Sequence, residues 1–329
     1  MTKAAVLVTG GAGYIGSHAA YALIDAGRPV VVIDDLSTGF RSAVPEEAVF
    51  AEGDIGDAAL VARLIEEHGV GAIMHFAGSV VVPESVTNPL KYYANNSCKS
   101  RALIESAVAC GLPRFIFSST AAVYGVPEAE RVDENAPEAP INPYGRSKLM
   151  TEWMLADAAA AHGFGHVSLR YFNVAGADPR GRAGQSTQGA THLVKVACEA
   201  ATGKRSHVEI YGDDYGTPDG TGVRDYIHVA DLVAAHVDAL AWLEAHPGQS
   251  ATLNCGYGRG HSVREVLDAV ERVSGRKIER RSAPRRAGDP PALIADNARI
   301  LATLPWRPCF NDLDRIVADA LAWEEKLTR

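Results

Sequence analysis

The chain has 329 residues, of which 47% are hydrophobic and 22% are charged, enough apolar content for one large domain or two moderate ones. Its formal net charge of -8 excludes the broad basic surface needed to bind nucleic acid or an anionic membrane, so any phosphate binding must be local. The sequence shows no apolar run near the roughly 20 residues that span a bilayer. It also shows no signal-peptide pattern after Met1, so we expect a cytoplasmic protein.

The cysteines and histidines predict neither a disulfide framework nor a metal site. Five cysteines are scattered without a CxxC pair, which indicates reduced thiols. His162 and His166 are four residues apart, but Gly163 and Gly165 between them indicate a turn rather than a metal-binding helix face. We therefore expect no metal.

Short β-branched segments alternate with helix-length segments through the first half of the chain. This alternation is typical of parallel strands joined by crossover helices, and it predicts an α/β fold with a doubly wound parallel sheet of the Rossmann type. The expected strands are residues 4–9, 30–34, 49–53, 72–76, 114–119 and 166–170, and the expected helices are residues 15–26, 58–68, 89–110 and 143–162.

Beyond about residue 174 the alternation loosens. The strand-like residues 252–255 are expected to return to the main sheet. We therefore expect a nucleotide-binding domain over residues 1–173, with a contribution from about 222–258, and a smaller α/β substrate domain over residues 174–329. Gly- and Pro-rich loops, whose composition favours functional sites, cover residues 175–189, 212–222 and 283–291.

A glycine motif follows the first expected strand and opens the first expected helix. In TGGAGYIG, residues 9–16, Gly10, Gly13 and Gly16 have the GxxGxxG spacing. Their missing side chains permit a tight turn, close approach to a pyrophosphate and close packing of helix on strand, while the helix N-terminus favours negative charge. This context predicts a dinucleotide site.

Acidic residues at the next strand ends favour NAD over NADP. Asp34 ends the second expected strand, where its carboxylate can accept hydrogen bonds from both adenosine ribose hydroxyls and would repel a 2′-phosphate. Asp35 follows, and the chain has no arginine between it and Arg41. Asp54 and Ile55 come after the third strand, where an adenine pocket is expected.

Tyr144 and Lys148 are four residues apart in the expected helix 143–162, so they project from one helix face. This spacing suits acid–base chemistry, because lowering the ordinary phenol pKa of about 10 to neutrality requires roughly 4 kcal/mol of stabilisation of the phenolate. A neighbouring ammonium and a positive nicotinamide ring together could supply it. Thr120, at the end of the fifth expected strand, completes a Ser/Thr-Tyr-Lys constellation in the ligand crevice of the sheet.

The sequence resembles the extended short-chain dehydrogenase/reductases, and within them the 4-epimerases of UDP-glucose, along nearly its whole length. The matching segments are TGGAGYIGSH (9–18), HFAG (75–78), FSSTAAVYG (117–125), PYGRSK (143–148), RYFNVAGA (170–177), DGTGVRDYIHV (219–229) and RRAGD (285–289). The last three of these segments exceed what a generic dinucleotide fold requires, so they are the most specific.

The resemblance implies a role for each matched residue. Tyr144 would be the base and acid at the sugar 4-hydroxyl, Lys148 would tune its pKa and bind the ribose of NAD, and Thr120 would bond the sugar oxygen. Besides Tyr144, Lys148 and the three glycines, the residues implied around NAD are Tyr14, Ile15, Asp34, Asp35, Asp54, Ile55, Phe76, Ala77, Asn95 and Tyr171. Those implied to hold UDP are Asn173, Leu193, Tyr211, Arg224, Tyr226, Arg286 and Asp289.

The implied activity is interconversion of UDP-glucose and UDP-galactose. Tyr144 would take the proton from O4 while NAD accepts a hydride from C4, and the 4-keto sugar would turn over before the hydride returns to its other face. NAD is expected to stay bound, since no net oxidation occurs. The family also implies a homodimer through the helices 89–110 and 143–162.

Rival activities differ in the groups that they need. Dehydratases and decarboxylases on this scaffold need further proton-transferring groups beside the central hydroxyl, and Ala121 and Ala122 after Thr120 argue against both. A non-epimerising nucleotide-sugar oxidoreductase stays open, because the sequence does not show whether the reduced cofactor is retained. An NAD-sensing binding protein would keep the glycines but would not need Tyr144 and Lys148 together.

Three positions depart from the family pattern. Val80 stands where many relatives have a lysine near the nicotinamide, and Thr191 and His192 replace the usual paired asparagines before Leu193, which puts one UDP contact in doubt. Leu293 stands where many relatives that exclude N-acetyl sugars have a tyrosine. The smaller leucine predicts tolerance for UDP-N-acetylhexosamines or UDP-pentoses.

Overall fold

The computed structural model describes residues 3–286 and 289–328, and its central feature is a sheet of seven parallel strands. The strand order is β11-β7-β5-β4-β1-β2-β3, so the chain starts near the middle of the sheet, moves to one edge and then returns to build the other half. The predicted doubly wound sheet is therefore confirmed. The strands are β1 (Ala5–Thr9), β2 (Val30–Asp34), β3 (Val49–Glu52), β4 (Val70–His75), β5 (Arg114–Thr120), β7 (Gly165–Tyr171) and β11 (Ala251–Cys255).

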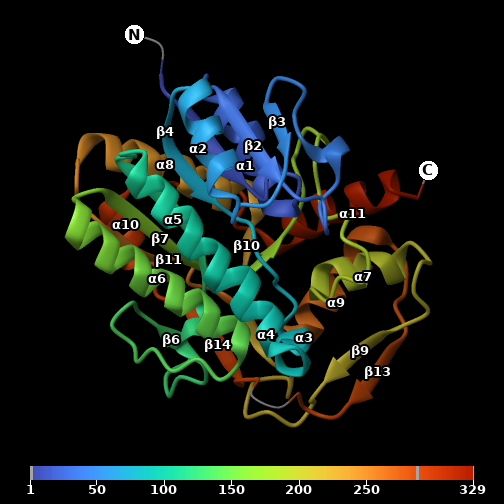
Figure 1. The fold of residues 1–329 in the computed structure, drawn as a ribbon. Coiled ribbons are helices and arrows are strands. Elements are labelled where there is room, and N and C mark those ends of the chain that lie inside the picture. Colours follow the sequence, from blue (N-terminus) through green and yellow to red (C-terminus); the bar gives the residue numbers. More distant parts are fainter. Residues whose placement is uncertain (1–2, 287–288, 329) are drawn as a thin grey trace.

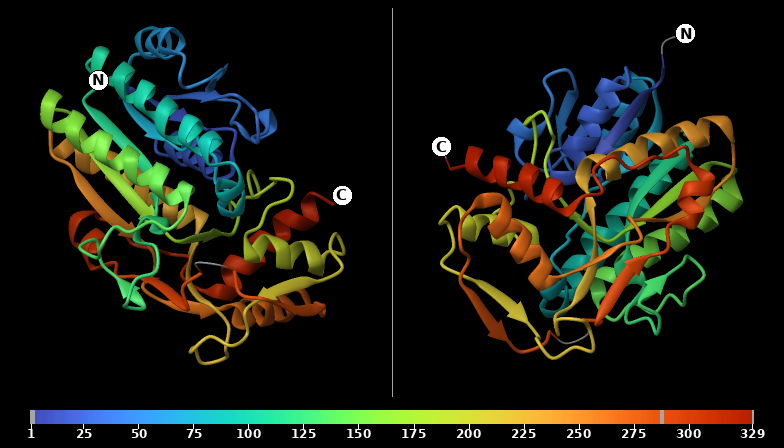
Figure 2. Two further views of the ribbon diagram at one scale, coloured as in Figure 1. Left: turned by 60° about the horizontal axis from the view of Figure 1, so that its bottom comes forward. Right: turned by 180° about the vertical axis from the view of Figure 1, so that it is seen from behind.

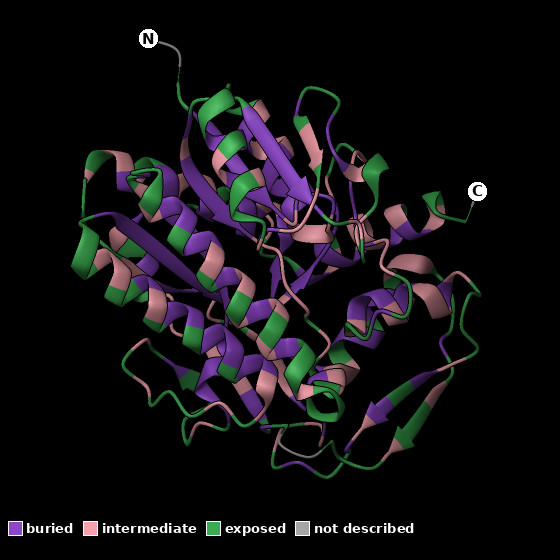
Figure 3. Cartoon of the chain, in the orientation of Figure 1, coloured by how far each residue is buried: buried purple, intermediate pink, exposed green. Residues whose placement is uncertain are grey.

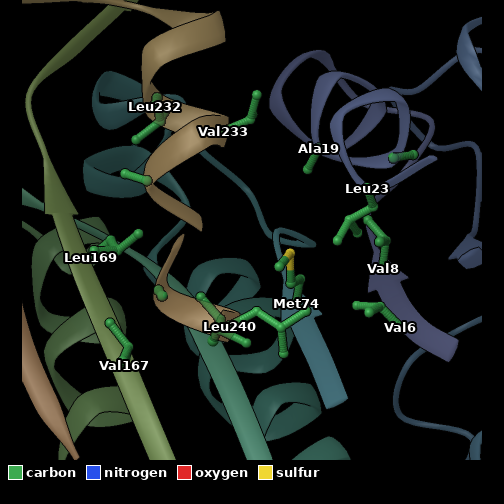
Figure 4. Packing of buried hydrophobic residues seen from close by; sticks show 14 of the residues in the cluster. Val6, Val8, Ala19, Leu23, Met74, Val167, Leu169, Leu232, Val233 and Leu240 are labelled. Atoms are coloured by element: carbon green, nitrogen blue, oxygen red, sulfur yellow. The ribbon is translucent and has the colours of Figure 1, made fainter. Parts of the chain in front are cut away.

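Helices cover both faces of this sheet (Figures 1 and 2). In β1, Val6 and Val8 face a core shared with α1 and α8, which Figure 4 shows from close by. Ala5 and Leu7 face the opposite core, under α2, α5 and α6, because successive side chains of a strand point to opposite faces. The helix bounds are α1 Tyr14–Asp25, α2 Ala58–Glu67, α5 Lys99–Ala109, α6 Pro143–His162 and α8 Val229–Ala245.

The six expected strands match observed strands to within about two residues at each end. Five of them are buried on both faces, which explains why they appear in the sequence as short continuous apolar runs rather than as alternating patterns, whereas the edge strand β3 is partly exposed. Figure 3 shows that buried residues lie along the sheet and that exposed residues lie on the outer sides of the helices. Residues 251–255 form the edge strand β11 beside β7, as expected for 252–255.

The expected helix over residues 89–110 is present from Pro89 to Ala109, but it contains a π-helical turn that was not predicted. The chain forms α4 (Pro89–Tyr92), a π-helical turn (Tyr93–Cys98) and then α5. The physical reason lies in Asn96, which is buried and exchanges hydrogen bonds with the Ser79 backbone: its Oδ1 accepts from N at 2.7 Å and its Nδ2 donates to O at 3.0 Å. A π-helical turn changes the direction of side chains along a helix, a feature that often marks functional sites.

The second part of the molecule is built on smaller sheets. One has the order β12-β10-β14-β6, with β8 also paired to β10, and the other pairs β13 with β9. β6 pairs with β14 although it precedes residue 173, so the chain crosses between the two parts several times and the division at residue 173 stays a prediction. The strands are β6 Arg131–Val132, β8 Asn173–Ala175, β9 Val208–Tyr211, β10 Val223–His228, β12 Gly260–Ser262, β13 Arg280–Ala283 and β14 Ala292–Ala295; the helices are α3 Val82–Thr87, α7 Leu193–Ala201, α9 Val263–Ser274, α10 Ala298–Thr303 and α11 Leu313–Lys326.

Local sequence fixes where α6 begins and ends. The Asn142 side chain accepts a hydrogen bond from Gly145 N at 2.8 Å, and Pro143 occupies the first helical position. Gly163 ends the helix in the left-handed conformation, with φ +75°. This start places Tyr144 in the first turn of the helix, close to the loops at the carboxyl ends of the strands.

Four buried histidines make the fold sensitive to acid. Burial lowers the pKa of His18, His166 and His236 to about 4 and that of His75 to about 3. In the unfolded chain their pKa is about 6.5, so the unfolded state takes up protons first as the pH falls. Stability from these neutral side chains is therefore complete above pH 6.5 and is lost as the pH falls toward 4.

Replacing His236 with leucine should flatten this pH dependence. His236 is fully buried in the apolar core beside Phe76, so the variant removes about 2 kcal/mol of the loss in unfolding free energy between pH 7 and pH 5. Urea unfolding at both pH values measures it. The exposed His162, replaced with glutamine, serves as the control and should leave the pH dependence unchanged. An equal loss in H236L and the unmodified protein would contradict the assignment.

Candidate active site

A cavity of about 510 Å³ lies where the central strands end. Residues after β1, β2, β3, β4, β5 and β7 line one side of it, and the segment from Gln185 to His192, with Arg224 and the stretch from Asp289 to Leu293, lines the other. Ligands of open parallel sheets bind at this carboxyl edge, because the loops from both halves of the sheet diverge there. The cavity volume suits a cofactor with a small substrate.

The glycine turn after β1 leaves no room for side chains. A Cβ on Gly10 would lie 2.6 Å from Ala77 N, and a Cβ on Gly16 would lie 2.2 Å from the Gly10 carbonyl oxygen. Gly10 also has φ +68°, a conformation that favours glycine. Gly13 caps α1 without a side chain, so the first N–H groups of the helix are open toward the cavity and fit a pyrophosphate.

Asp34 is held firmly at the end of β2. Its Oδ2 accepts a hydrogen bond from Ala12 N and its Oδ1 one from Leu36 N, both at 2.9 Å. Leu36 takes a left-handed conformation, φ +54°, to make this turn. Burial raises the pKa of Asp34 and the two backbone donors oppose that rise. The carboxylate lines the cavity with lone pairs to spare, which fits a ribose diol.

Asp54 has a partner that the sequence did not reveal. Its carboxylate pairs with Lys99 Nζ at 2.6 Å and accepts from Gly56 N at 2.8 Å. Burial opposes the change, but these two donors together lower the pKa of Asp54. Lys99 comes from the first position of α5 and lines the cavity as well, so this end of the site has balanced charge.

The three residues predicted to be catalytic, Tyr144, Lys148 and Thr120, lie at the same part of the site. Tyr144 and Thr120 both line the cavity, and Lys148 is buried directly behind them. Lys148 Nζ donates to the Ser118 carbonyl at 2.9 Å and lies 4.8 Å from the centre of the Phe117 ring. The helix spacing predicted that Tyr144 and Lys148 share one face, and α6 presents that face to β5.

Burial acts on both the Tyr144 phenol and the Lys148 ammonium, and the expected role of Lys148 in lowering the pKa of the phenol stays a prediction. Burial raises the pKa of Tyr144, and the Thr120 hydroxyl opposes the rise. Burial lowers the pKa of Lys148 to about 8, and Glu152 opposes that change. The physical reason is that desolvation disfavours both charged forms, while the Lys148 ammonium is turned toward Ser118.

Most predicted site residues line the cavity, and five do not. Lys148 lies just behind the wall, Tyr226 is buried in the core under α9, and Leu193 begins α7 against the same core. The Arg286 guanidinium stacks on the Tyr211 ring at 3.8 Å, outside the cavity wall. Their ligand roles stay predictions, and residues 287–288 of the RRAGD segment lie outside the described residues. The predicted residues that line the cavity are Gly10, Gly13, Tyr14, Ile15, Gly16, Asp34, Asp35, Asp54, Ile55, Phe76, Ala77, Asn95, Thr120, Tyr144, Tyr171, Asn173, Arg224 and Asp289.

Sequence reasoning missed several polar groups of the wall. Ser79 lies between Asn95, whose Nδ2 donates to its Oγ at 3.0 Å, and Asn96, which bonds its backbone. The pair of asparagines inside an expected helix was a usable signal, because asparagine disfavours helix interiors. Gln185 lies in the Gly-rich stretch 175–189, whose composition did indicate a functional loop.

The three departures from the family pattern all face the cavity. Val80 is 49% exposed and lines it beside Ser79. His192 lines it too, with its Nδ1 2.9 Å from Gln185 Nε2. Leu293 lies near Arg224, its partner in the register of β14 on β10. Each departure can therefore affect a ligand directly.

Within residues 3–286 and 289–328, no group of three or more His, Cys, Asp or Glu side chains is placed to hold a metal ion. The helices in that part of the chain include none with the length and apolar character needed to cross a bilayer.

Comparison with known proteins agrees with this geometry. Residues 6–256 match the model of the NAD dependent epimerase/dehydratase family. The chain is 58% identical over 322 residues to the UDP-glucose 4-epimerase of Azospirillum brasilense, covering 98% of this chain and 92% of the relative. A crystal structure of UDP-glucose 4-epimerase from Brucella ovis in complex with NAD has a TM-score of 0.94 at 46% identity and covers 97% of this chain and 98% of that one. The UDP-Glc/GlcNAc 4-epimerase of Campylobacter jejuni has a TM-score of 0.86 at 46% identity and covers 98% of this chain and 100% of its own.

The resemblance noted in the sequence is thereby confirmed, and the chain belongs to the NAD dependent epimerase/dehydratase family, within the extended short-chain dehydrogenase/reductases.

Proposed function

We propose that this enzyme interconverts UDP-glucose and UDP-galactose by inverting C4 of the hexose. The observation that carries the proposal is that Tyr144, Thr120 and the glycine turn after β1 line the same cavity, so a nucleotide cofactor and a sugar hydroxyl can meet there. NAD bound to that turn supplies an acceptor for the C4 hydride and returns it to the opposite face of the 4-keto sugar.

Tyr144, Thr120, Lys148 and Arg224 have different roles in this reaction. Tyr144 moves the proton at the sugar O4 in both directions, and Thr120 holds that oxygen through its hydroxyl. The buried Lys148 ammonium, one helical turn from Tyr144, would stabilise the phenolate by its charge. Arg224 anchors the substrate diphosphate, since a guanidinium matches phosphate oxygens well, while the sugar turns over.

Incubating the purified enzyme with UDP-galactose, without added reductant, should yield UDP-glucose. The denatured protein should release NAD rather than NADP, as chromatography can show. Tyr144→Phe should lower kcat by about 10²- to 10⁴-fold and leave the dissociation constant for UDP-glucose nearly unchanged, because only the proton transfer is lost. Near-normal turnover in Y144F, or net formation of a 4-keto sugar, would sink the proposal.

Leu293, which pairs with Arg224 in the register of β14 on β10, favours a broad sugar specificity. Leu293 leaves more space beside the sugar than a tyrosine would, so the enzyme should also turn over UDP-N-acetylgalactosamine or UDP-arabinose. Leu293→Tyr should reduce kcat/KM for UDP-N-acetylgalactosamine at least tenfold and change that for UDP-galactose little, since the larger side chain leaves less space for the bulkier N-acetyl sugar. Unmodified enzyme that acts on UDP-galactose alone would remove the idea.

We also propose a cytoplasmic homodimer with a nucleotide-binding domain (1–173, with part of 222–258) and a UDP-sugar-binding domain (174–329). Five free thiols suit a reducing compartment. An apolar patch on α3, α4 and α6 supports the dimer: Val86, Leu90, Met150 and Trp153 are 62%, 77%, 38% and 54% exposed. These helices pack against one another, so the exposed apolar side chains lie on neighbouring helices and suit a partner copy.

Trp153→Glu should convert the dimer to a monomer, because it buries a charge at the centre of the interface. Sedimentation velocity at micromolar concentration measures this. Leu327→Glu, a similar change at an exposed leucine after α11, is the matched control and should leave the dimer intact. A monomer in the unmodified protein would contradict the homodimer.

A further inference from the structure

The catalytic helix α6 carries a second buried charge one turn beyond Lys148. Tyr144, Lys148 and Glu152 are each four residues apart, so they share the face that packs on the sheet. Glu152 is 6% exposed. Its Oε1 accepts a hydrogen bond from Ser119 Oγ, so the chain neighbours Ser118 and Ser119 contact Lys148 and Glu152.

Arg170 completes the buried pair. It lies on β7 directly opposite Ser119 in the strand register and is 2% exposed. Its Nε donates to both Glu152 oxygens, at 3.0 and 3.1 Å, and its Nη2 donates to Oε2 at 2.5 Å. Nη1 donates to Tyr124 Oη at 3.1 Å, and Nη2 also pairs with Glu138. All three guanidinium nitrogens of Arg170 thus donate to polar partners, as a charge in the core requires.

The network extends from the helix to the rest of the scaffold. Tyr124 Oη donates to Asn254 Oδ1 at 2.7 Å, and Asn254 Nδ2 donates to the Val132 carbonyl at 2.9 Å. The side chains of α6, β7 and β11 and the backbone of β6 are therefore connected by hydrogen bonds under the active site. This connection fixes the rotation of α6 about its axis, and with it the position of Lys148.

Charge around Lys148 is balanced by Glu152. Burial lowers the pKa of His75 to about 3 and raises the pKa of Tyr92 and Tyr171, so these neighbours are neutral near pH 7. Among the described residues, the titratable groups coupled to Lys148 are Glu152 on α6 and His75 on β4, while Tyr92 on α4 and Tyr171 on β7 are coupled to Tyr144, and Arg170 on β7 is coupled to Glu152. Of these, Glu152 carries the negative charge.

We propose that Glu152, locked in place by Arg170, is a positioning residue that keeps the Lys148 side chain protonated in its place behind the cavity wall. The inference rests on the proposed function, which gives Lys148 its task. It adds that a buried carboxylate remote from the substrate sustains the ammonium that in turn sustains the Tyr144 phenolate. A cation surrounded by neutral groups and a buried guanidinium would otherwise lose its proton.

The test is the titration of Lys148 itself. NMR of the full-length enzyme labelled with 13Cε-lysine, as purified, follows each lysine with pH, and the Lys148→Met spectrum assigns the signal. Glu152→Gln removes the charge at nearly equal volume and should lower the pKa of Lys148 by about one unit or more. Glu138→Gln is the matched control: it removes the other carboxylate that pairs with Arg170, which is not coupled to Lys148, and should leave the Lys148 titration unchanged.

An unchanged titration of Lys148 in E152Q would overturn the proposal, whatever happens to thermal stability. Should E152Q fail to fold, Glu152→Asp retains the charge but withdraws it by one methylene, so a smaller shift in the same direction is expected and no shift overturns the proposal. With UDP-galactose as substrate, the alkaline limb of the kcat profile should move down with the Lys148 pKa. The NMR result stands apart from turnover, so absence of epimerase activity would sink the proposed function without deciding this point.

Discussion

A buried phenol that must lose its proton is the constraint on which this site depends. The desolvation that raises the pKa of Tyr144 also lowers that of Lys148, so neither charge is stable there alone. Opposite charges placed close together compensate each other, and a cationic ring bound on the glycine turn would add to the same balance. The cavity is thus compatible with acid–base chemistry because its charged groups are compensated by opposite charges nearby.

The parallel sheet makes such a set possible from residues that are far apart in sequence. All central strands end at the same edge, so the turn after β1, Asp34 after β2 and Thr120 after β5 meet without long loops. The close approach of Gly10 to Ala77 shows how tightly neighbouring strand ends pack there. Helix α6 then needs only a correct start and a correct rotation to bring Tyr144 to the edge.

The sequence predicted the nucleotide half of the molecule well, because its signals are local. Buried strands, the glycine spacing and the acidic strand ends each occupy a few consecutive residues, and their places in the fold followed from topology. Asn96 and Lys99 were missed, since a π-helical turn depends on a contact with Ser79 that no periodicity encodes. The pKa of Tyr144 was also beyond reach, because desolvation depends on which chain segments close over the phenol.

The second half was harder to predict for the same reason. Its short strands pair across large sequence separations, as β6 does with β14 and β8 with β10, and two- or three-residue strands have little pattern of their own. The substrate-side residues were identified by family likeness rather than by local chemistry. Tyr226 and Arg286 show the limit of that route, since they lie near the site but outside the cavity wall.

The interleaved path of the chain limits how the protein can be divided. A fragment ending near residue 173 would lack α8, which covers β5 and β7, and β11, which shields the edge of β7. Such a fragment would present a bare apolar face and an unpaired strand, both of which promote aggregation. Exchanging the nucleotide-binding domain with that of another protein therefore requires two separate chain segments. A split reporter built on this fold would reassemble when a fragment carrying α8 and β11 binds the rest of the sheet.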